Sequence, residues 1–199
     1  FTWKDPSMAA RPYENRDPRF AATIMPNNST FQGRPVECWE GGADGPDKNN
    51  ASRTGYYLLK YVDPELKLLQ GQSAIHSWII IRLGEIYLNY AEAMNEAYGP
   101  DAKGIYGKSA REAVNEVRGR VGMPDVVADS KEEMREKIRH ERRVELAFED
   151  HRFWDICRWM DGDTVKDIYG IKITKKGSKY TYTRTKIQTR VWDKKMYLY

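Results

Sequence analysis

The chain has 199 residues, of which 40% are hydrophobic and 12% aromatic, and it carries a formal net charge of +4 at pH 7. This composition is sufficient for one globular domain with a hydrophobic core, so it excludes a chain that is disordered throughout. It also excludes a membrane-spanning helix, because the longest apolar run, at residues 78–81, ends at Arg82 and a span needs roughly 18 residues.

The two cysteines, Cys38 and Cys157, are too few and too far apart for a disulfide framework, and neither belongs to a cluster with zinc-ligand spacing. We therefore expect no metal and no cofactor, while the redox state of both thiols is left open. The chain starts at Phe1 without an initiator Met, a basic segment or an apolar segment. We expect that any targeting signal has been removed or lies upstream.

Residues 1–77 are rich in Pro, Gly and Asn and show no sustained helical period, which predicts loops with short strands. Residues 78–160 carry helical periodicity instead. In the first helix, which ends at Gly99-Pro100, the apolar side chains gather on one face of a helical wheel, and we expect that face to be buried. It contains Trp78, Ile79, Leu83, Ile86, Tyr87, Tyr90, Met94 and Ala97.

A second helix is predicted from about Ser109 to Arg120, with Ala113, Val114 and Val117 facing inward. A loop joins the first two helices, which predicts a helical hairpin. The pattern Ser130-x-x-Glu133 is a capping box that opens a third helix.

A densely charged stretch, residues 140–159, lies along the third helix and the segment after it. The helical wheel places Glu141, Arg142, Glu145 and Glu149 on the same arc as the apolar residues of the third helix. A buried charge costs several kcal/mol unless it is paired. We therefore expect ion pairs between Arg142 and Glu145 and between Glu149 and Arg152, with further partners such as Arg82 or Arg118.

Clustered titratable groups are also typical of active sites. Three catalytic motifs can be compared with the spacing of the charged residues in this stretch. A zinc protease needs H-E-x-x-H, but Val144 stands where the second histidine belongs. A glycosidase needs two carboxylates across a cleft, whereas Glu141 and Glu145 share one core-facing helix. Since the sequence also contains no G-x-S-x-G elbow and no Gly-rich phosphate loop, we predict no catalytic residues.

Residues 161–199 contain a predicted β-hairpin and a tail. From Asp163 onward there are eight Lys and two Arg against three Asp, so the basic charge belongs mainly to this region. Lysines alternate with apolar or hydroxyl side chains, as on the exposed face of a hairpin. We interpret the charge as a solvated face, with nucleic-acid binding as the alternative.

Three segments in the order "IIIRLGEIYLNYAEAMNEAYG", "AVNEVRGRVGMP" and "IRHERRVELAFEDHRFWDICRW" resemble the carboxy-terminal half of the SusD/RagB family. The upstream "NRDPRF" and "TGYYLLKY" and the terminal "VWDKKMYLY" are also typical of this family. The resemblance covers nearly the whole chain, and we interpret its charged segment as a structural signature. The structural ion pairs are assigned to Glu141, Arg142, Glu145, Glu149 and Arg152.

The resemblance implies a mainly α fold: TPR-like helical hairpins, a loop-rich irregular region and a small β-hairpin. It implies a lipoprotein on the outer leaflet of the outer membrane, at the cell surface of a Gram-negative bacterium. Such proteins serve nutrient uptake: they capture oligosaccharides, or in some members peptides, and pass them to a SusC-type TonB-dependent transporter. Glycan binding is therefore our first hypothesis, RagB-like peptide binding the second and a basic nucleic-acid-binding domain a remote third.

The chain departs from the family in its length. Family members begin with a signal peptide and a lipid-bearing cysteine, and Cys38 is not that cysteine because no apolar run precedes it. The family's Pro-Ile-Pro and Asn-Pro-Gly ending is also missing beyond Tyr199. We expect a carboxy-terminal portion of a longer protein, with the lipid anchor and part of the ligand site elsewhere.

Carbohydrate sites combine flat aromatic rings with a few polar groups, and loops usually present them. Trp39 is the first candidate, because the polar run at residues 40–50 that follows it has no hydrophobic core pattern. Two alternatives stay open: Trp39 covers a small core beneath the loops, and the Asp and Asn side chains of the run only form turns. The candidate ligand-binding residues are Trp39, Trp3, Tyr13, Phe31, Asp47 and Asn49.

Overall fold

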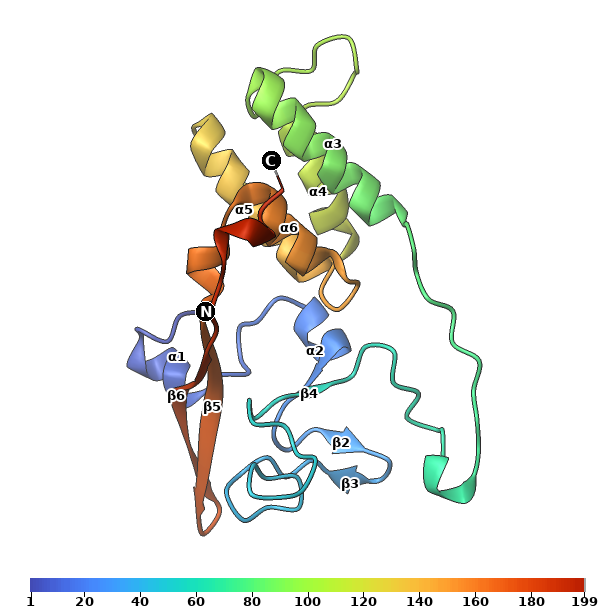
Figure 1. Cartoon of the computed structure of the whole chain (residues 1–199), viewed down its shortest axis with the longest axis vertical. Coiled ribbons are helices and arrows are strands. Elements are labelled where there is room, and N and C mark those ends of the chain that lie inside the picture. Colours follow the sequence, from blue (N-terminus) through green and yellow to red (C-terminus); the bar gives the residue numbers. More distant parts are fainter. Residues whose placement is uncertain (199) are drawn as a thin grey trace. The chain divides into compact units, whose positions relative to one another are not determined.

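The computed structural model describes residues 1–198 (Figure 1). These residues form two compact units, which are described separately. The loop-rich unit contains residues 1–16, 20–76 and 156–198, and the helical unit contains residues 17–19 and 77–155. None of the helices among the described residues is long and apolar enough to cross a bilayer.

The loop-rich unit contains short elements, as the Pro, Gly and Asn content of its first part predicts. Strand β1 (Ile24–Met25) pairs with β4 (Tyr57–Leu58), and β2 (Thr30–Phe31) pairs with β3 (Arg34–Pro35), both antiparallel. Gln32 and Gly33 connect β2 to β3 with positive φ angles, as a two-residue hairpin turn requires. The remaining short helices are α1 (Pro6–Ala10), α2 (Arg19–Thr23), η1 (Leu68–Gln70), η2 (Gly162–Val165) and η3 (Lys194–Met196).

A long antiparallel hairpin of β5 (Asp167–Lys176) and β6 (Lys179–Thr189) provides the regular part of this unit. Ile171 and Ile173 are buried while Lys172 between them is exposed, so one face of β5 packs on the core. The free edge of β5 is also occupied: Ile171 donates its N–H to the carbonyl of Thr54, and Glu40 donates to the carbonyl of Ile173. The predicted hairpin is thus present, and loop segments cover the edge that would otherwise attract another strand.

Gly55 lies where the loop meets β5, and we expect Gly55→Ala to lower the free energy of unfolding by about 3 kcal/mol. Its φ angle is +74°, and a Cβ at this position would overlap the carbonyl oxygen and the side chain of Ile171. Gly177 in the hairpin turn is the matched control, because its φ is also positive (+59°) but a Cβ there meets no atom within 4 Å. Gly177→Ala should therefore cost only about 1 kcal/mol in the same urea titration, and equal costs would contradict the packing of the loop on β5.

The helical unit contains α3 (Leu83–Tyr98), α4 (Ala110–Arg120), α5 (Lys131–Glu145) and the start of α6 (His151–Trp159). Figure 1 shows α3, α4 and α5 side by side, and α3 packs against both α4 and α5. Alanines at the contact allow this close approach. The buried core consists of Leu88, Ala91, Met94, Ala110, Ala113, Val114, Val117, Val126, Ala128, Met134, Ile138 and Leu146.

The helix starts follow local signals in the sequence. Ser109 caps α4 with a complete capping box, in which Ser109 and Glu112 each accept the other's backbone N–H. Ser130 caps α5 by accepting the N–H of Glu133, but the Glu133 carboxylate accepts the N–H of Asp129 instead of Ser130. The predicted start of the third helix is therefore confirmed. Of the predicted capping box, the bond to the Ser130 side chain is present and the reciprocal bond from the Ser130 N–H to Glu133 is replaced by one from Asp129.

The predicted core face of the first helix is wrong in part. The helix begins at Leu83, so residues 78–81 precede it, and the buried positions are Leu88, Ala91, Met94 and Asn95. Leu83, Ile86 and Ala97 are exposed, while Tyr87 and Tyr90 only border the core. The reason is that α3 has apolar residues on two faces, and packing against α4 and α5 selects the face with the small Ala91.

Candidate functional site

The four aromatic residues predicted to bind ligand lie around one core in the loop-rich unit. Val36, Cys38, Ile171 and Ile173 form its buried centre. The partly buried aromatic rings packed against that centre are Trp3, Tyr13, Phe31, Trp39, Tyr56, Tyr57, Tyr180 and Tyr182. The structure thus brings the predicted aromatics together, with four tyrosines that the sequence pattern did not single out.

Tyr13 is half-buried among other aromatic rings. Its ring contacts Tyr182 at 5.3 Å and Tyr56 at 6.2 Å between centroids, both in edge-on geometry. Burial raises the pKa of the Tyr13 hydroxyl well above its usual value. Tyr13 therefore acts chiefly in packing the cluster, because ring contacts surround it.

Trp39 lies half-buried beside the hairpin. The ammonium of Lys175 is 4.0 Å from the centroid of its ring, and the ring of Tyr180 is 5.7 Å away. A cation at this distance from the ring is a cation–π contact and covers one face of the indole. A sugar that stacks on that face has to displace Lys175.

The polar loop after Trp39 is tied down by its own side chains. Arg34 donates two hydrogen bonds of 2.7 Å to the carboxylate of Asp44, which also accepts the N–H of Glu37. Asp47 accepts the N–H of Gly41 at 3.0 Å, and its bonds with Lys48 and Gly41 lower its pKa to about 2. Asp47 therefore forms a turn in this structure, and its exposed carboxylate stays ionised.

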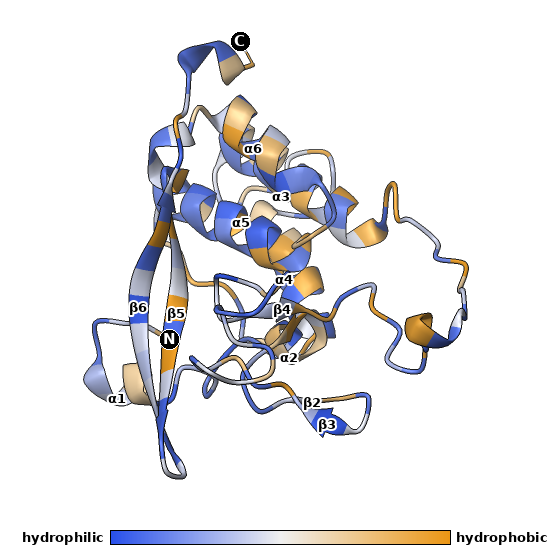
Figure 2. Cartoon of the chain, turned by 60° about the horizontal axis from the view of Figure 1, so that its bottom comes forward, coloured by the Kyte–Doolittle hydropathy of each residue, from blue (hydrophilic) through white to orange (hydrophobic). Residues whose placement is uncertain are grey.

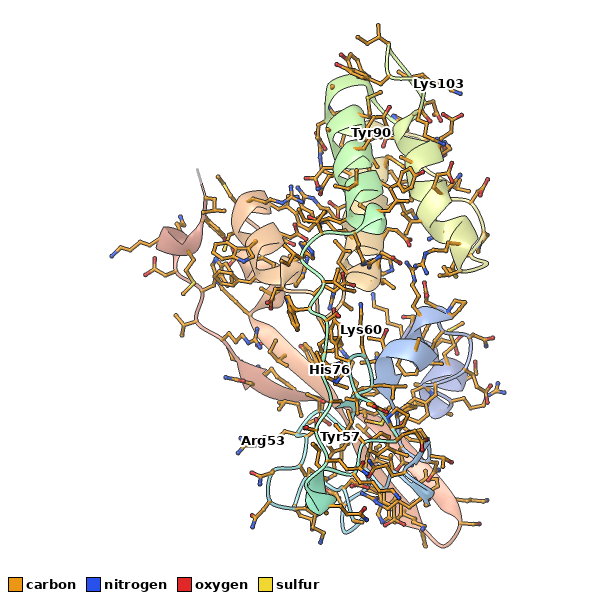
Figure 3. All side chains as sticks on the ribbon, turned by 90° about the vertical axis from the view of Figure 1, so that its right-hand side faces the viewer. Arg53, Tyr57, Lys60, His76, Tyr90 and Lys103 are labelled. Atoms are coloured by element: carbon orange, nitrogen blue, oxygen red, sulfur yellow. The ribbon has the colours of Figure 1, made fainter. Side chains whose placement is uncertain are left out.

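Tyr57 connects this loop to the next segment. Its hydroxyl donates to the carbonyl of Asp44 at 2.9 Å and accepts the N–H of Ser52 at 3.1 Å. Figure 3 labels Tyr57 in the lower part of the view, among the loop segments. Asn49 is exposed in the same loop, so its amide is available to solvent and to a ligand.

A groove of about 1100 Å³ lies on the loop-rich unit, between the β2–β3 turn and residues 61–76. Gln32 of the turn donates to the carbonyl of Leu66 at 2.9 Å and so fixes one wall to the other. Of the six predicted ligand residues only Phe31 lines this groove, together with the aromatic Tyr61. Its aliphatic lining residues are Val62, Pro64, Leu66, Leu68, Leu69 and Ala74, and its polar ones include Gln70, Gln72 and His76.

The charged stretch forms a buried ion-pair network in the helical unit. Glu145 is 97% buried and accepts bonds of 2.6–2.8 Å from three guanidinium groups. These belong to Arg19, Arg82 and Arg120. Glu141 pairs with Arg19 at 2.7 Å and with Arg118 at 2.8 Å. Helices α4 and α5, the N-cap residue of α3 and the short segment 17–19 therefore meet at these two carboxylates.

Arg82 and Gly84 show how closely this network is packed. Besides Glu145, Arg82 donates to both carboxylate oxygens of Glu149 at 2.6 and 2.8 Å. A Cβ at Gly84 would lie 2.6 Å from Nη1 of Arg82 and 3.0 Å from Oε1 of Glu145. The glycine at the start of α3 thus leaves the space that the guanidinium occupies.

The predicted partner of Arg142 is wrong. Its Nε donates to both oxygens of Asp155 at 2.9 and 2.7 Å, and its Nη1 donates to Asn89 at 2.6 Å, whereas Glu145 is bound by other arginines. The pairing expected from an i, i+3 spacing is overridden because α6 brings Asp155 against α5. Arg152 lies half-buried in the first turn of α6.

The electrostatics of the network do not suit acid–base catalysis. Burial acts to raise the pKa of Glu145, but hydrogen bonds from Arg82 and Arg19 outweigh it and hold the pKa below its usual value. Burial also lowers the pKa of the neighbouring His140. A carboxylate held ionised by three arginines neither donates a proton nor has a free lone pair for a nucleophilic role, so the arrangement favours a structural role.

The sequence pattern did not identify several members of the network, since they are distant in the chain. Arg19 binds Glu145 across 126 positions of sequence and is itself held by Asp17 at 2.6–2.8 Å. Arg19 and Asp17 both lie in the "NRDPRF" motif, and that motif was the feature of the sequence that could have identified them. Among the described residues no group of three or more His, Cys, Asp or Glu side chains has metal-binding geometry.

Comparison with known proteins identifies the family. The model of the SusD family matches residues 4–199. The SusD-like protein P25 of Formosa agariphila is 36% identical over 85 residues, which are 41% of this chain and 15% of that protein. The chain therefore spans less than a sixth of the curated relative in this alignment.

Two solved structures from Bacteroides fragilis share the fold. A SusD-like protein superposes with a TM-score of 0.80 at 36% identity, covering 94% of this chain and 36% of the other. A SusD-like carbohydrate-binding protein superposes with a TM-score of 0.69 at 34% identity, and the match covers 85% of this chain and 34% of the other.

The chain belongs to the SusD family, and its helical hairpins are of the TPR-like kind. Members of this family are typically associated with the outer-membrane surface and bind carbohydrate without catalysis.

Proposed function

We propose that this protein captures oligosaccharides at the bacterial cell surface and passes them to a SusC-type TonB-dependent transporter. The observation that supports this most is membership of a carbohydrate-binding family over nearly the whole chain. In this proposal the protein lies on the outer leaflet of the outer membrane, held by a lipid anchor outside the residues of this chain.

We assign ligand contact to the loop-rich unit. Its half-buried aromatic rings and exposed amides are the groups that sugar faces and hydroxyls require. Trp39 is proposed as a stacking ring and Phe31 as a wall of the groove, with Asp47 and Asn49 as polar contacts. The bidentate bond between Arg34 and Asp44 connects the β2–β3 hairpin to the loop after Trp39, so both parts belong to one supported surface.

Trp39→Ala should weaken glycan binding about tenfold, since loss of one stacking ring removes about 1.4 kcal/mol. Affinity electrophoresis and calorimetry against plant, host and microbial glycans and short peptides provide the measurement. Trp154→Ala is the matched control, because Trp154 is 58% exposed on α6 in the helical unit. Lys175→Ala should retain binding, because it uncovers a face of the indole. A folded chain that binds no glycan, or equal losses in both tryptophan variants, would contradict the proposal for Trp39.

Peptide capture is the second candidate, and the groove is the observation that favours it. Aliphatic side chains outnumber aromatic ones along its lining, which suits apolar peptide side chains better than sugar rings. In this case short peptides bind in the same panel, Trp39→Ala leaves their affinity unchanged, and a charge introduced by Leu68→Asp abolishes it.

A further inference from the structure

The turn that joins β5 to β6 carries positive charge without counter-ions. We call residues 175–180 the hairpin tip, and its exposed lysines are Lys175, Lys176 and Lys179. In the part of the chain that the structure describes, none of these three ammonium groups pairs with a carboxylate. Figure 2 shows hydrophobic colour in the middle of β5 and hydrophilic colour at this turn. Charge without counter-ions produces a positive potential at this end of the hairpin, which attracts anions.

Two of these lysines oppose each other across the strands. Lys176 and Lys179 are direct partners in the register, and like charges in that position destabilise a strand pair. A lysine on β6 protects the free edge of that strand from pairing with another chain. The edge of β5, however, already pairs with loop segments, so edge protection does not account for the lysine on that strand. A negatively charged ligand would relieve the repulsion between the two lysines.

Lys175 lies beside two aromatic rings at the same end of the hairpin. Its ammonium is 4.0 Å from the centroid of the Trp39 ring and 5.6 Å from that of Tyr180, its cross-strand partner. Both aromatic residues are half-buried, and their ring centroids are 5.7 Å apart. Gly42 packs against the indole, since a Cβ there would lie 3.0 Å from Cδ2 of Trp39. The hairpin tip thus places a cation against two partly exposed rings, one of them fixed by packing.

The carboxylates of residues 37–47, the loop around Trp39, do not neutralise Lys175. Three of them pair with other cations at 2.7–3.0 Å: Asp44 with Arg34, Asp47 with Lys48 and Glu40 with Lys172. The fourth belongs to Glu37 and accepts the backbone N–H of Ala43. The ammonium of Lys175 can therefore bind a negative group that a ligand supplies.

We propose that Trp39, Tyr180 and Lys175 form a subsite for an acidic sugar, whose negative group is a carboxylate or a sulfate. This inference rests on the proposed function and names the class of glycan. The sugar ring stacks on the indole and displaces the ammonium of Lys175, which then pairs with the negative group at the rim of the sugar ring. An uncharged sugar also has to displace Lys175, but it loses the cation–π contact and provides no ion pair in return. The subsite therefore selects for charge.

A nucleic acid is the competing ligand, because it also offers flat rings and negative charge. The surroundings of Trp39 disfavour it. Four carboxylates lie within residues 37–47, and a strand with one phosphate per nucleotide would bring its charges close to them. In a glycan, hydroxyl groups separate the acidic substituents, and these hydroxyls can donate hydrogen bonds to the carboxylates.

The test is calorimetry with pairs of oligosaccharides that differ only in charge. Every acidic glycan of the plant, host and microbial panel is compared with its uncharged form, such as an oligogalacturonate with its methyl ester and a sulfated galactan with its desulfated form. These two kinds of pair distinguish a carboxylate ligand from a sulfate ligand. The variants are Lys175→Ala, Lys175→Arg and Trp39→Ala, each verified as folded by a melting curve. Lys186→Ala is the matched control, because it removes the same charge from β6 at a 53% exposed side chain that pairs with Asp167.

We expect the protein to bind an acidic glycan about fivefold more tightly than its uncharged form, because an exposed ion pair contributes about that factor. Lys175→Ala should lose this preference, whereas Lys175→Arg and Lys186→Ala should keep it. Trp39→Ala should weaken binding of both forms. The binding that Lys175→Ala retains is thus that of the uncharged form.

Equal affinities for the charged and uncharged forms would overturn the proposal while glycan capture stands. So would a preference that survives in Lys175→Ala, or one that Lys186→Ala removes equally. A protein that binds no glycan at all would contradict the proposed function itself, and this subsite with it. A single-stranded oligonucleotide bound as tightly as the acidic glycan, with an affinity that falls steeply as salt is added, would identify a nonspecific cationic surface instead.

Discussion

Glu145→Ala is expected to lower the free energy of unfolding by about 4 kcal/mol, because it leaves Arg19, Arg82 and Arg120 around an empty buried site. Removing one member of a buried ion-pair network costs far more than the net contribution of the intact network, since the remaining charges lose their counter-ion. The measurement is a urea titration followed by circular dichroism.

Glu136→Ala on the same helix is the control. The Glu136 side chain is 74% exposed and lies 3.8 Å from Arg139, so its removal should cost less than about 1 kcal/mol. If Glu145→Ala melted at the wild-type temperature but no longer bound ligand, the structural interpretation of the charged stretch would be wrong.

The second large effect on stability is expected from the buried ion pair of Arg142 and Asp155. Their side chains are only 5% and 4% exposed. We expect Arg142→Met and Asp155→Ala each to cost about 3 kcal/mol, while the double variant costs at least 1 kcal/mol less than the sum, because neither charge is then left unpaired.

The pair of Arg111 and Asp101 serves as the control for this double-mutant cycle. Arg111 also makes two hydrogen bonds, of 2.6 and 2.9 Å, to the two carboxylate oxygens of Asp101, one from Nε and one from Nη2, but Asp101 is 66% exposed. Its coupling should not exceed about 1 kcal/mol, because solvent screens an exposed pair. Equal coupling energies for the two pairs would refute the idea that burial of Arg142 and Asp155 makes their ion pair important.

The local parts of the fold were predictable because their signals are local. The Ser109 and Ser130 caps each lie within three residues of the glutamate that they serve, and the alternation in β5 spans only a few positions. The start and the core face of α3 were not predictable in the same way. A helical wheel finds an apolar face, but it does not decide which of two apolar faces packs against the neighbouring helices. That decision depends on Ala110 and Ala113 of α4, which come later in the chain.

The candidate site was predictable only in part, for a similar reason. Trp39 stood out by its polar surroundings, but the lysine that covers its ring comes from the distant strand β5. One wall of the groove is formed by residues of the segment 61–76, which has no regular hydrophobic period and therefore did not indicate a site. Pairings such as Arg142 with Asp155 depend on how helices dock, which an i, i+3 rule does not describe.

The measurement that tests the central claim most directly is a calorimetric titration of one glycan into three proteins: the wild-type chain, Glu145→Gln and Trp39→Ala, each at a temperature where circular dichroism shows it folded. If the helical network is scaffold and the loop-rich unit binds ligand, Glu145→Gln keeps its Kd within about twofold, whereas Trp39→Ala loses about tenfold. A folded Glu145→Gln that no longer binds, beside a Trp39→Ala that binds as tightly as wild type, would contradict this division of roles.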